Sequence, residues 1–238
     1  MNAEKPYILL IFDVDGTLTM SDGATSRALK RAFIELTGSK IEPEVKFPAG
    51  KTDPQIFREM IESAGIHVDD FDSLFAQFKK LYFPIAQDEL HKAARARLLP
   101  GVNELLTAIS KDHRFALTLG TGNLKDSGME KLRMHGVAHL FPVGGFGSDA
   151  EERSEILRTA LRRSEEYWHT KFDLENTWVI GDTPRDVAAG KALGAHTITV
   201  ATGVYKPKEL VESHPDGVLE TLEDKDKFFG IILGSQSK

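Results

Sequence analysis

Short apolar runs alternate with longer amphipathic segments over most of the chain. Residues 7–14, YILLIFDV, have the length and apolar continuity of a strand that is buried on both faces. Four later runs are also short, rich in β-forming side chains and followed by glycine or a polar turn, namely residues 115–120, 139–145, 177–182 and 196–203. Helical patterns separate them at residues 102–111, 124–135, 151–168 and 185–193. This order predicts an α/β fold with a doubly wound parallel sheet.

Residues 20–98 interrupt the alternation and predict a helical insert after the first strand, with helical patterns at about residues 26–36, 54–64 and 71–91. Aromatic side chains recur there at spacings of three and four, which favours an apolar core of the insert over a ligand cage: Phe71, Phe75, Phe78 and Tyr82. Pro100-Gly101 then marks the return to the main domain. We therefore expect a core of residues 1–19 and 99–238 and an inserted helical domain of residues 20–98.

Composition excludes several classes of function. The formal net charge of −6, without a basic stripe in the sequence, argues against nucleic acid as a partner. The chain has no cysteine, which removes disulfides, thiolate zinc sites and cysteine nucleophiles, and its eight histidines lack the spacing of a zinc site. Its apolar runs are too short for a membrane span or the core of a signal peptide. We expect a cytoplasmic protein with no membrane partner.

Polar side chains follow four of the predicted strands. Because the carboxyl ends of parallel strands meet at one edge of a sheet, these side chains are expected to converge on one crevice. The segments are Asp13, Asp15, Gly16 and Thr17 after the first strand, GTGN at residues 120–123, FGSDAEER at residues 146–153, and GDTPRD at residues 181–186.

Four carboxylates, those of Asp13, Asp15, Asp182 and Asp186, would then share a small volume. Such a cluster repels itself unless a cation neutralises it, and hard oxygen ligands favour Mg2+. Each segment also has a simpler explanation. An Asp-Gly pair is common in turns, and GDTPRD could be only a capped turn that starts a helix at Pro184.

The GTGN segment has the character of an anion site. Its glycines free backbone amides to point at an anion, the helix that follows favours negative charge at its start, and Thr121 adds a hydroxyl donor. The alternative is a tight turn that Asn123 caps. A phosphate bound there would bridge these donors and the metal.

Taken together, the motifs resemble those of a known superfamily. DVDGTLT, then TGN after a strand, then a basic residue at the start of a later helix, and then GDTPRD resemble, in this order, the four motifs of the haloacid dehalogenase superfamily. The helical insert is similar to the helical cap of its phosphoglycolate phosphatase and β-phosphoglucomutase branch, so the resemblance spans nearly the whole chain. It implies a Rossmann-like core and a Mg2+-dependent phosphatase that acts on a small phosphorylated metabolite through an aspartyl-phosphate.

The resemblance also implies a role for each acidic residue. Asp13 would be the nucleophile, and Asp15 the general acid and base. Thr121 would hold the transferring phosphoryl group. Asp13, the backbone carbonyl of Asp15 and Asp182 would hold Mg2+, with Asp186 as a further ligand or a partner of the ligands. These roles require two nearby carboxylates to hold different protonation states.

Other residues are expected to contact phosphate or substrate. Four of them flank the groups above: Gly16, Thr17, Gly122 and Asn123. In the insert, FPAGKTDP at residues 47–54 resembles the substrate loop of the cap, where Lys51 could cover an anionic substrate. Asp53-Pro54 is also an ordinary helix start, which leaves a local structural role open.

The basic residue of the third motif is the least regular match, because many relatives place lysine and proline where this chain reads EERSEIL. We favour Arg153, whose guanidinium could bridge the nucleophile and the phosphate, over Arg158. An exposed arginine that forms ion pairs with glutamates along the helix is the alternative.

Rival functions fit less well or stay open. AGKT lacks the first glycine of a P-loop, since Val45 stands in that position, and acidic residues crowd the helix start after GFGSDA, where a dinucleotide would bind. A phospho-receiver module also has an acidic Mg2+ pocket, but such modules are shorter and lack the insert and GDTPRD. A phosphomutase would use the same residues, so the sequence leaves it open. We expect a monomer or a small homo-oligomer.

Overall fold

A six-stranded parallel sheet forms the centre of the molecule. The structure is a computed structural model, and it describes residues 5–234. The strands are adjacent in the order β5-β4-β1-β6-β7-β8, and every neighbouring pair is parallel. Their bounds are β1 (Ile8–Phe12), β4 (Phe115–Thr121), β5 (Gly144–Phe146), β6 (Thr177–Gly181), β7 (His196–Val200) and β8 (Gly217–Leu219). The predicted α/β class with a doubly wound sheet is confirmed.

The central strand β1 explains why its sequence is apolar at every position. It pairs with β4 on one side and β6 on the other, so that Leu10 lies between Leu117 and Trp178. All five of its residues are buried, because helices cover both faces of the sheet. Side chains of Ile8 and Phe12 join the apolar cluster on one face, and Leu9 joins the cluster on the other.

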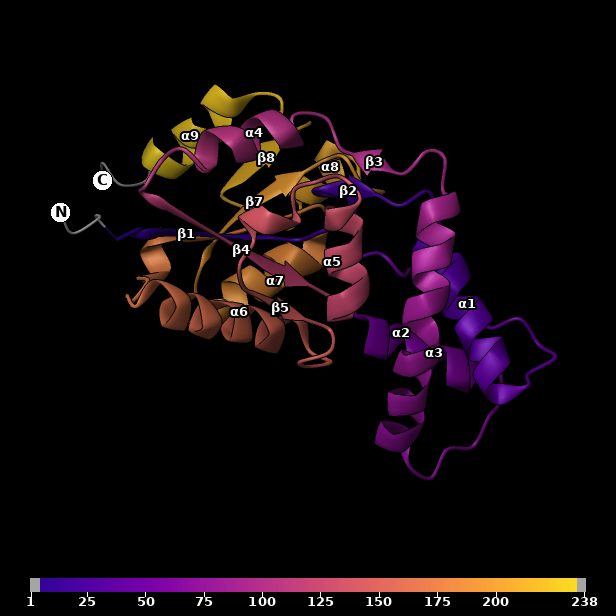
Figure 1. Ribbon diagram of the computed structural model, residues 1–238. Coiled ribbons are helices and arrows are strands. Elements are labelled where there is room, and N and C mark those ends of the chain that lie inside the picture. The colour runs from indigo at the N-terminus through magenta and orange to yellow at the C-terminus, as the bar shows by residue number, and fades with distance from the viewer. Residues whose placement is uncertain (1–4, 235–238) are drawn as a thin grey trace.

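Helices pack on both faces of this sheet (Figure 1). One face carries α4 (Val102–Ile109), α5 (Lys125–Arg133) and α9 (Lys225–Gly234), whose apolar side chains join the larger core cluster. The other face carries α6 (Arg153–Trp168) and α7 (Pro184–Leu193). The short helix α8 (Pro207–Val211) precedes β8. This arrangement directs the carboxyl ends of the strands to one edge.

One predicted strand was wrong. Residues 139–145 do not form a continuous strand, because Ala138–Leu140 is a 3-10 turn and only Gly144–Phe146 pairs with β4. Pro142 explains the difference, since proline lacks the N–H that a sheet ladder needs and restricts the residue before it. The turn instead inserts Phe141 into the core, where its ring packs edge-on to Phe12 at 6.3 Å.

The last part of the core was not predicted. Strand β8 extends the sheet at its β7 edge, and the apolar segment FFGIILG lies in α9. Helix α9 buries Phe228 and Ile232 against the sheet. Among the helices of residues 5–234, none is both long enough and apolar enough to cross a membrane.

The predicted helical insert is confirmed. It consists of α1 (Ala24–Thr37), α2 (Asp53–Ser63) and α3 (Phe71–Lys92), and it lies at one end of the sheet (Figure 1). Its two connections to the core pair with each other as an antiparallel ribbon of β2 (Thr19–Met20) and β3 (Arg97–Leu98). This ribbon supports our proposal that residues 20–98 form one domain and residues 1–19 and 99–238 the other.

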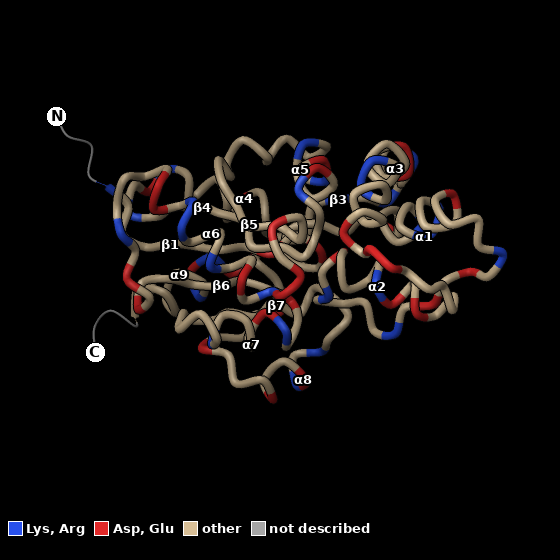
Figure 2. Tube along the Cα trace, turned by 90° about the horizontal axis from the view of Figure 1, so that it is seen from below, with Lys and Arg blue, Asp and Glu red and all other residues tan. Residues whose placement is uncertain are grey.

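An aromatic cluster forms the centre of the insert. Phe57 of α2 is fully buried, and its ring lies 4.2 Å from that of Phe78. The aromatic residues singled out in the sequence stack in series along α3, namely Phe71, Phe75, Phe78 and Tyr82. Their predicted role as the core of the insert is therefore confirmed. Charged residues of both signs are interspersed along the backbone of the insert and of the core (Figure 2).

Replacing Phe57 with alanine is expected to destabilise the insert strongly. Loss of a fully buried ring leaves a cavity and costs about 3–5 kcal/mol of unfolding free energy. Urea unfolding followed by helical circular dichroism measures the change. Phe47→Ala is the control, because the Phe47 side chain is 81% exposed and its loss should change stability by less than about 0.5 kcal/mol. Equal effects of the two substitutions would contradict the packing described here.

Candidate active site

A cavity of about 690 Å³ lies where the carboxyl ends of β1, β4 and β6 face the insert. The core contributes acidic and polar side chains, and the insert contributes the loop at residues 42–51 and parts of α1 and α2. Most of the sequence-predicted site residues line it: Asp13, Asp15, Gly16, Lys51, Thr121, Gly122, Asn123, Arg153 and Asp182. Asp186 reaches the same cluster from α7, through the contacts described below.

Asp13 follows β1 directly and is held close to the sheet. Its backbone N–H donates to the carbonyl of Ile180 on β6 at 2.9 Å. The side chain is buried, and its Oδ1 lies 2.7 Å from Nη2 of Arg153. Burial raises the pKa of the Asp13 carboxyl to about 6, and the Arg153 charge limits this rise. The carboxyl is therefore close to its titration range at neutral pH while it stays accessible from the cavity.

Asp182 and Asp186 complete a cluster of buried carboxylates around Asp13. One oxygen from each of the three lies within 4.8 Å of the others. Burial, together with the charges of Asp186 and Asp13, raises the pKa of Asp182 to about 9. Its Oδ1 is buried with no hydrogen-bond partner among the residues that the structure describes. The possible metal ligands in this cluster are all carboxylate oxygens, and one of them, Oδ1 of Asp182, has no hydrogen-bond partner among the described residues. Such a set of ligands fits a hard divalent cation.

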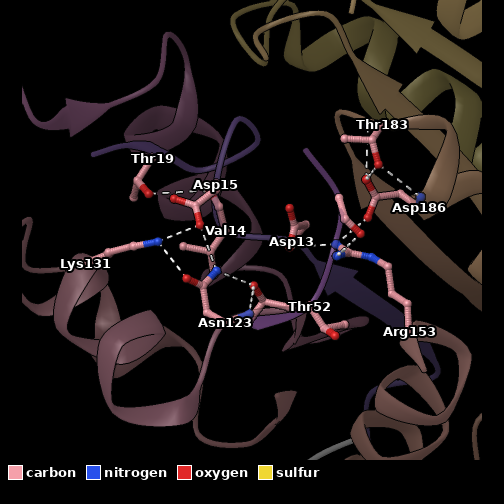
Figure 3. A network of polar contacts seen from close by, with 12 residues as sticks. Asp13, Val14, Asp15, Thr19, Thr52, Asn123, Lys131, Arg153, Thr183 and Asp186 are labelled. Atoms are coloured by element: carbon pink, nitrogen blue, oxygen red, sulfur yellow. Dashed lines mark hydrogen bonds and ion pairs between the residues drawn. The ribbon is translucent and has the colours of Figure 1, made fainter. Parts of the chain in front are cut away.

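Arg153 supplies positive charge to this cluster. It stands at the start of α6, and its guanidinium lies between Asp13 and Asp186, with Nη2 at 2.5 Å from Oδ1 of Asp186 (Figure 3). Although burial opposes the charged form, Asp13 and Asp186 raise the pKa of Arg153 above its usual value. Arg158 lies elsewhere, at the surface, where it pairs with Glu155. The structure thus brings Arg153 into the site and leaves Arg158 outside it.

Asp186 has two structural roles that its sequence motif indicated. Its Oδ2 accepts hydrogen bonds from the backbone N–H and the hydroxyl of Thr183, which caps α7 at Pro184. Its Oδ1 faces Arg153. The interpretation of GDTPRD as a capped turn and its interpretation as part of an acidic site are therefore compatible, because the cap fixes the carboxylate beside the cluster.

Asp15 belongs to a second polar group on the other side of Asp13 (Figure 3). Its Oδ2 accepts a hydrogen bond from Nδ2 of Asn123 at 2.8 Å and one from Nζ of Lys131 at 2.5 Å. Lys131 also donates to Oδ1 of Asn123 at 2.7 Å, and Nδ2 of Asn123 lies 2.8 Å from Oγ1 of Thr121. Asp15, Asn123, Thr121 and Lys131 therefore form one connected network.

The sequence analysis did not identify Lys131 as a residue of the site. Its side chain is only 2% exposed, although it carries a charge. The signal was available in α5, where Lys131 follows Leu124 and Gly128 at the spacings of seven and three that mark the buried face of a helix. A lysine at such a position is rarely buried without a carboxylate partner.

The glycine and threonine positions differ in what they contribute. Gly16 has a positive φ of 77°, and a Cβ there would lie 2.3 Å from Oδ2 of Asp182, so only glycine allows this approach. A Cβ on Gly122 would lie 2.6 Å from the carbonyl oxygen of Lys51. Thr17 is fully buried, its hydroxyl has no partner among residues 5–234, and it is not among the residues that line the cavity.

The loop around Lys51 joins the insert to the core. Lys51 lines the cavity with its ammonium group already bonded to the Glu59 carboxylate and the Lys46 carbonyl. Asp53, which the sequence analysis treated only as a helix start, is buried, and its Oδ2 accepts from the backbone N–H of Leu124 at 2.7 Å. Burial raises the pKa of Asp53 to about 6, and this hydrogen bond opposes the rise.

Two named relatives are similar to this chain over almost their full length. A phosphoglycolate phosphatase of Nitrosococcus oceani is 24% identical over 224 residues, which cover 92% of this chain and 94% of that protein. The pyrophosphatase PpaX of Listeria monocytogenes is 24% identical over 221 residues, which cover 90% of this chain and 93% of that protein.

Solved structures share the fold. A hydrolase from Pseudomonas syringae aligns with a TM-score of 0.71 at 18% identity and covers 94% of this chain and 99% of its own. A haloacid dehalogenase-like protein from Streptococcus pneumoniae aligns with a TM-score of 0.64 at 20% identity and covers 93% and 98%. Residues 10–200 match the sequence pattern of the haloacid dehalogenase-like hydrolases. The chain therefore belongs to the haloacid dehalogenase-like hydrolase family.

Proposed function

We propose that the protein is a Mg2+-dependent phosphatase that hydrolyses a small phosphomonoester through an aspartyl-phosphate on Asp13. The observation that carries the proposal is the buried cluster of Asp13, Asp182 and Asp186, with an unpartnered carboxylate oxygen, beside a fourth carboxylate, that of Asp15. The named relatives, a phosphoglycolate phosphatase and a pyrophosphatase, both cleave phosphate groups by their names and support the same class of reaction.

Asp13 is suited to nucleophilic attack on phosphorus. With a pKa of about 6, its carboxylate is mostly ionised at pH 7, and Arg153 stabilises that charge. An Asp13 oxygen forms a bond to phosphorus while the bond from phosphorus to the ester oxygen breaks. Water then attacks the phosphorus of the intermediate, the bond to Asp13 breaks, and inorganic phosphate leaves with the carboxylate restored.

Asp15 is suited to proton transfer in both steps. It donates a proton to the leaving alcohol oxygen in the first step, and it accepts one from the attacking water in the second. Its side chain is 43% exposed to the cavity, in contrast to the buried Asp13 carboxylate. The two carboxylates therefore occupy environments that differ enough to divide the roles of nucleophile and acid.

The cation would be held by Asp13, Asp182 and the backbone carbonyl of Asp15, with Asp186 as a further ligand or as the partner that fixes Arg153. When bound, Mg2+ neutralises the cluster and withdraws charge from the phosphoryl oxygens. Gly16 keeps the backbone close enough to Asp182 for this arrangement, because any side chain there would occupy the space of the carboxylate.

The phosphoryl group would lie between the cation ligands and the GTGN segment. Thr121 offers its hydroxyl, and Gly122 and Asn123 line the cavity beside it. We keep Thr17 only as support of the loop, since it is fully buried and is not among the residues that line the cavity. Lys51 would contact the leaving group through hydrogen bonds, with its charge balanced by Glu59. The insert closes over the phosphate and limits the access of water.

The proposal extends to the cellular setting. We propose a cytoplasmic enzyme whose partner is a small phosphorylated metabolite rather than nucleic acid or membrane, and which acts as a monomer or small homo-oligomer. The net charge of −6 supports a preference against nucleic acid.

Asp13→Asn is expected to lower Mg2+-dependent turnover by about 10³-fold or more, because the amide cannot form the phosphoenzyme. Phosphate release is measured on phosphoglycolate, sugar phosphates and nucleotides, with and without Mg2+. Asp69→Asn is the control, since the Asp69 side chain is 96% exposed on the insert. Turnover that survives in Asp13→Asn would contradict the assignment of Asp13 as the nucleophile. If the wild-type protein moved the phosphate to another position of the substrate without releasing it, the enzyme would be a mutase.

Asp182→Asn is expected to weaken Mg2+ binding by at least about 10–100-fold, the loss that follows even from removal of a residue that supports a ligand. Isothermal titration calorimetry with MgCl2 alone measures the affinity directly. The Asp69→Asn protein should bind as the wild type does. An unchanged affinity in Asp182→Asn would contradict the assignment of Asp182 as a ligand.

The stability of the metal-free protein is expected to fall as the pH rises. A carboxyl whose pKa is raised on folding, here Asp182 at about 9, favours the folded state while it is protonated and loses that contribution as it ionises. Melting temperatures in EDTA should therefore decrease between pH 6 and 9. Asp182→Asn removes the titrating group and should flatten this slope. An identical slope in both proteins would show that Asp182 does not titrate in that range.

A further inference from the structure

We propose that Lys131 is a positioning residue for the phosphatase reaction, which holds the Asp15 carboxylate in the orientation needed for proton exchange with the leaving oxygen. This inference rests on the proposed function, because it assigns Lys131 a task in the step that Asp15 performs. Lys131 makes no contact with the nucleophile Asp13 in the network of Figure 3, so its effect reaches the reaction only through Asp15 and Asn123.

The burial of Lys131 is the first argument. A charged ammonium group loses its hydration when it is buried, and a position on a helix in the core would be filled more favourably by an apolar side chain. Here the side chain is 2% exposed, and its Nζ lies 2.5 Å from Oδ2 of Asp15 and 2.7 Å from Oδ1 of Asn123. The charge is therefore placed against the proposed acid and base, at a cost that a purely structural position would avoid.

The second argument is the freedom that Asp15 would otherwise have. Asp15 lies in the turn after β1, and its side chain is 43% exposed, so packing alone does not fix its rotamer. Two donors, Asn123 and Lys131, both bond to the same oxygen, Oδ2. They leave Oδ1 without a hydrogen bond from residues 5–234, as the oxygen available to the leaving group.

The third argument is the link from this network to the phosphate. Asn123 shares its Nδ2 between Asp15 and the hydroxyl of Thr121, and its Oδ1 accepts from Lys131. Lys131 thereby fixes the orientation of the Asn123 amide, which in turn fixes the distance from Asp15 to the group proposed to hold the phosphoryl oxygens. A misplacement of about 1 Å between such groups can cost about 10²-fold in rate.

The test uses the dependence of the reaction on the leaving group. Cleavage of an alkyl phosphate such as glycerol 3-phosphate or a sugar phosphate needs a proton on the leaving oxygen, whereas p-nitrophenolate leaves from p-nitrophenyl phosphate without one. The ratio kcat/KM reports the steps up to the first bond cleavage, which is the step that Asp15 assists as an acid. Both substrates are measured with Mg2+ on the full chain.

In Lys131→Met, which keeps the stem and removes the ammonium, kcat/KM for the alkyl phosphate is expected to fall by about 10²-fold. The value for p-nitrophenyl phosphate should change by less than about threefold, since this leaving group needs no proton from Asp15 and the nucleophile Asp13 is not bonded to Lys131. Lys125→Met is the matched control, because Lys125 is exposed at the start of the same helix. It should leave both values unchanged.

Two further variants keep the inference open to refutation. Lys131→Arg retains the charge and should recover part of the alkyl phosphate activity. If Lys131→Met does not fold, Lys131→Gln supplies a neutral side chain that is too short to reach both acceptors, and the same selective loss is expected. Equal losses on both substrates, or no loss on either, would overturn the positioning role of Lys131 while the phosphatase proposal stands. A wild-type protein without phosphate release from any ester would overturn both.

Discussion

The repulsion among three buried carboxylates, opposed by a single guanidinium, is the constraint on which the rest of the structure depends. Asp13, Asp182 and Asp186 are placed together by strand ends and a helix cap that cannot move independently of the sheet. Arg153 balances part of this charge from α6. The negative charge that Arg153 leaves uncompensated makes the cluster costly on its own, and this excess is what suits the site to a hard divalent ion.

Much of the fold could be read from the sequence because the signals were local and repeated. The apolar β1 run, the helical patterns and the aromatic spacing of α3 each indicated which side chains are buried. The strand expected at residues 139–145 failed because Pro142 overrides an apolar run, and the C-terminal FFGIILG segment gave no periodicity that separates a short strand from a short helix. Such cases are decided by packing partners far away in the chain.

The residues of the candidate site also divide into those that local sequence signals could identify and those that only distant contacts reveal. Asp13, Asp15, Asp182 and Arg153 stand in motifs at strand or helix ends, so topology alone brings them to one edge. Lys131 and Asp53 lie on helices that the topology brings near Asp15 and Leu124, and only side-chain contacts reveal their partners. Thr17 shows the opposite case, since it belongs to a motif but is buried and is not among the residues that line the cavity. A motif fixes the path of the backbone more reliably than the direction of each side chain.

The short ribbon of β2 and β3 determines how the two parts of the molecule are joined. Because the outgoing and returning connections pair with each other, the chain crosses between the core and the insert at one place rather than at two separated points. The sheet, its hydrogen-bond ladder and the acidic cluster are complete without any strand from the insert. A change in the length or the lining of the insert would therefore alter one wall of the cavity and leave the strand ends that carry the acidic cluster in place.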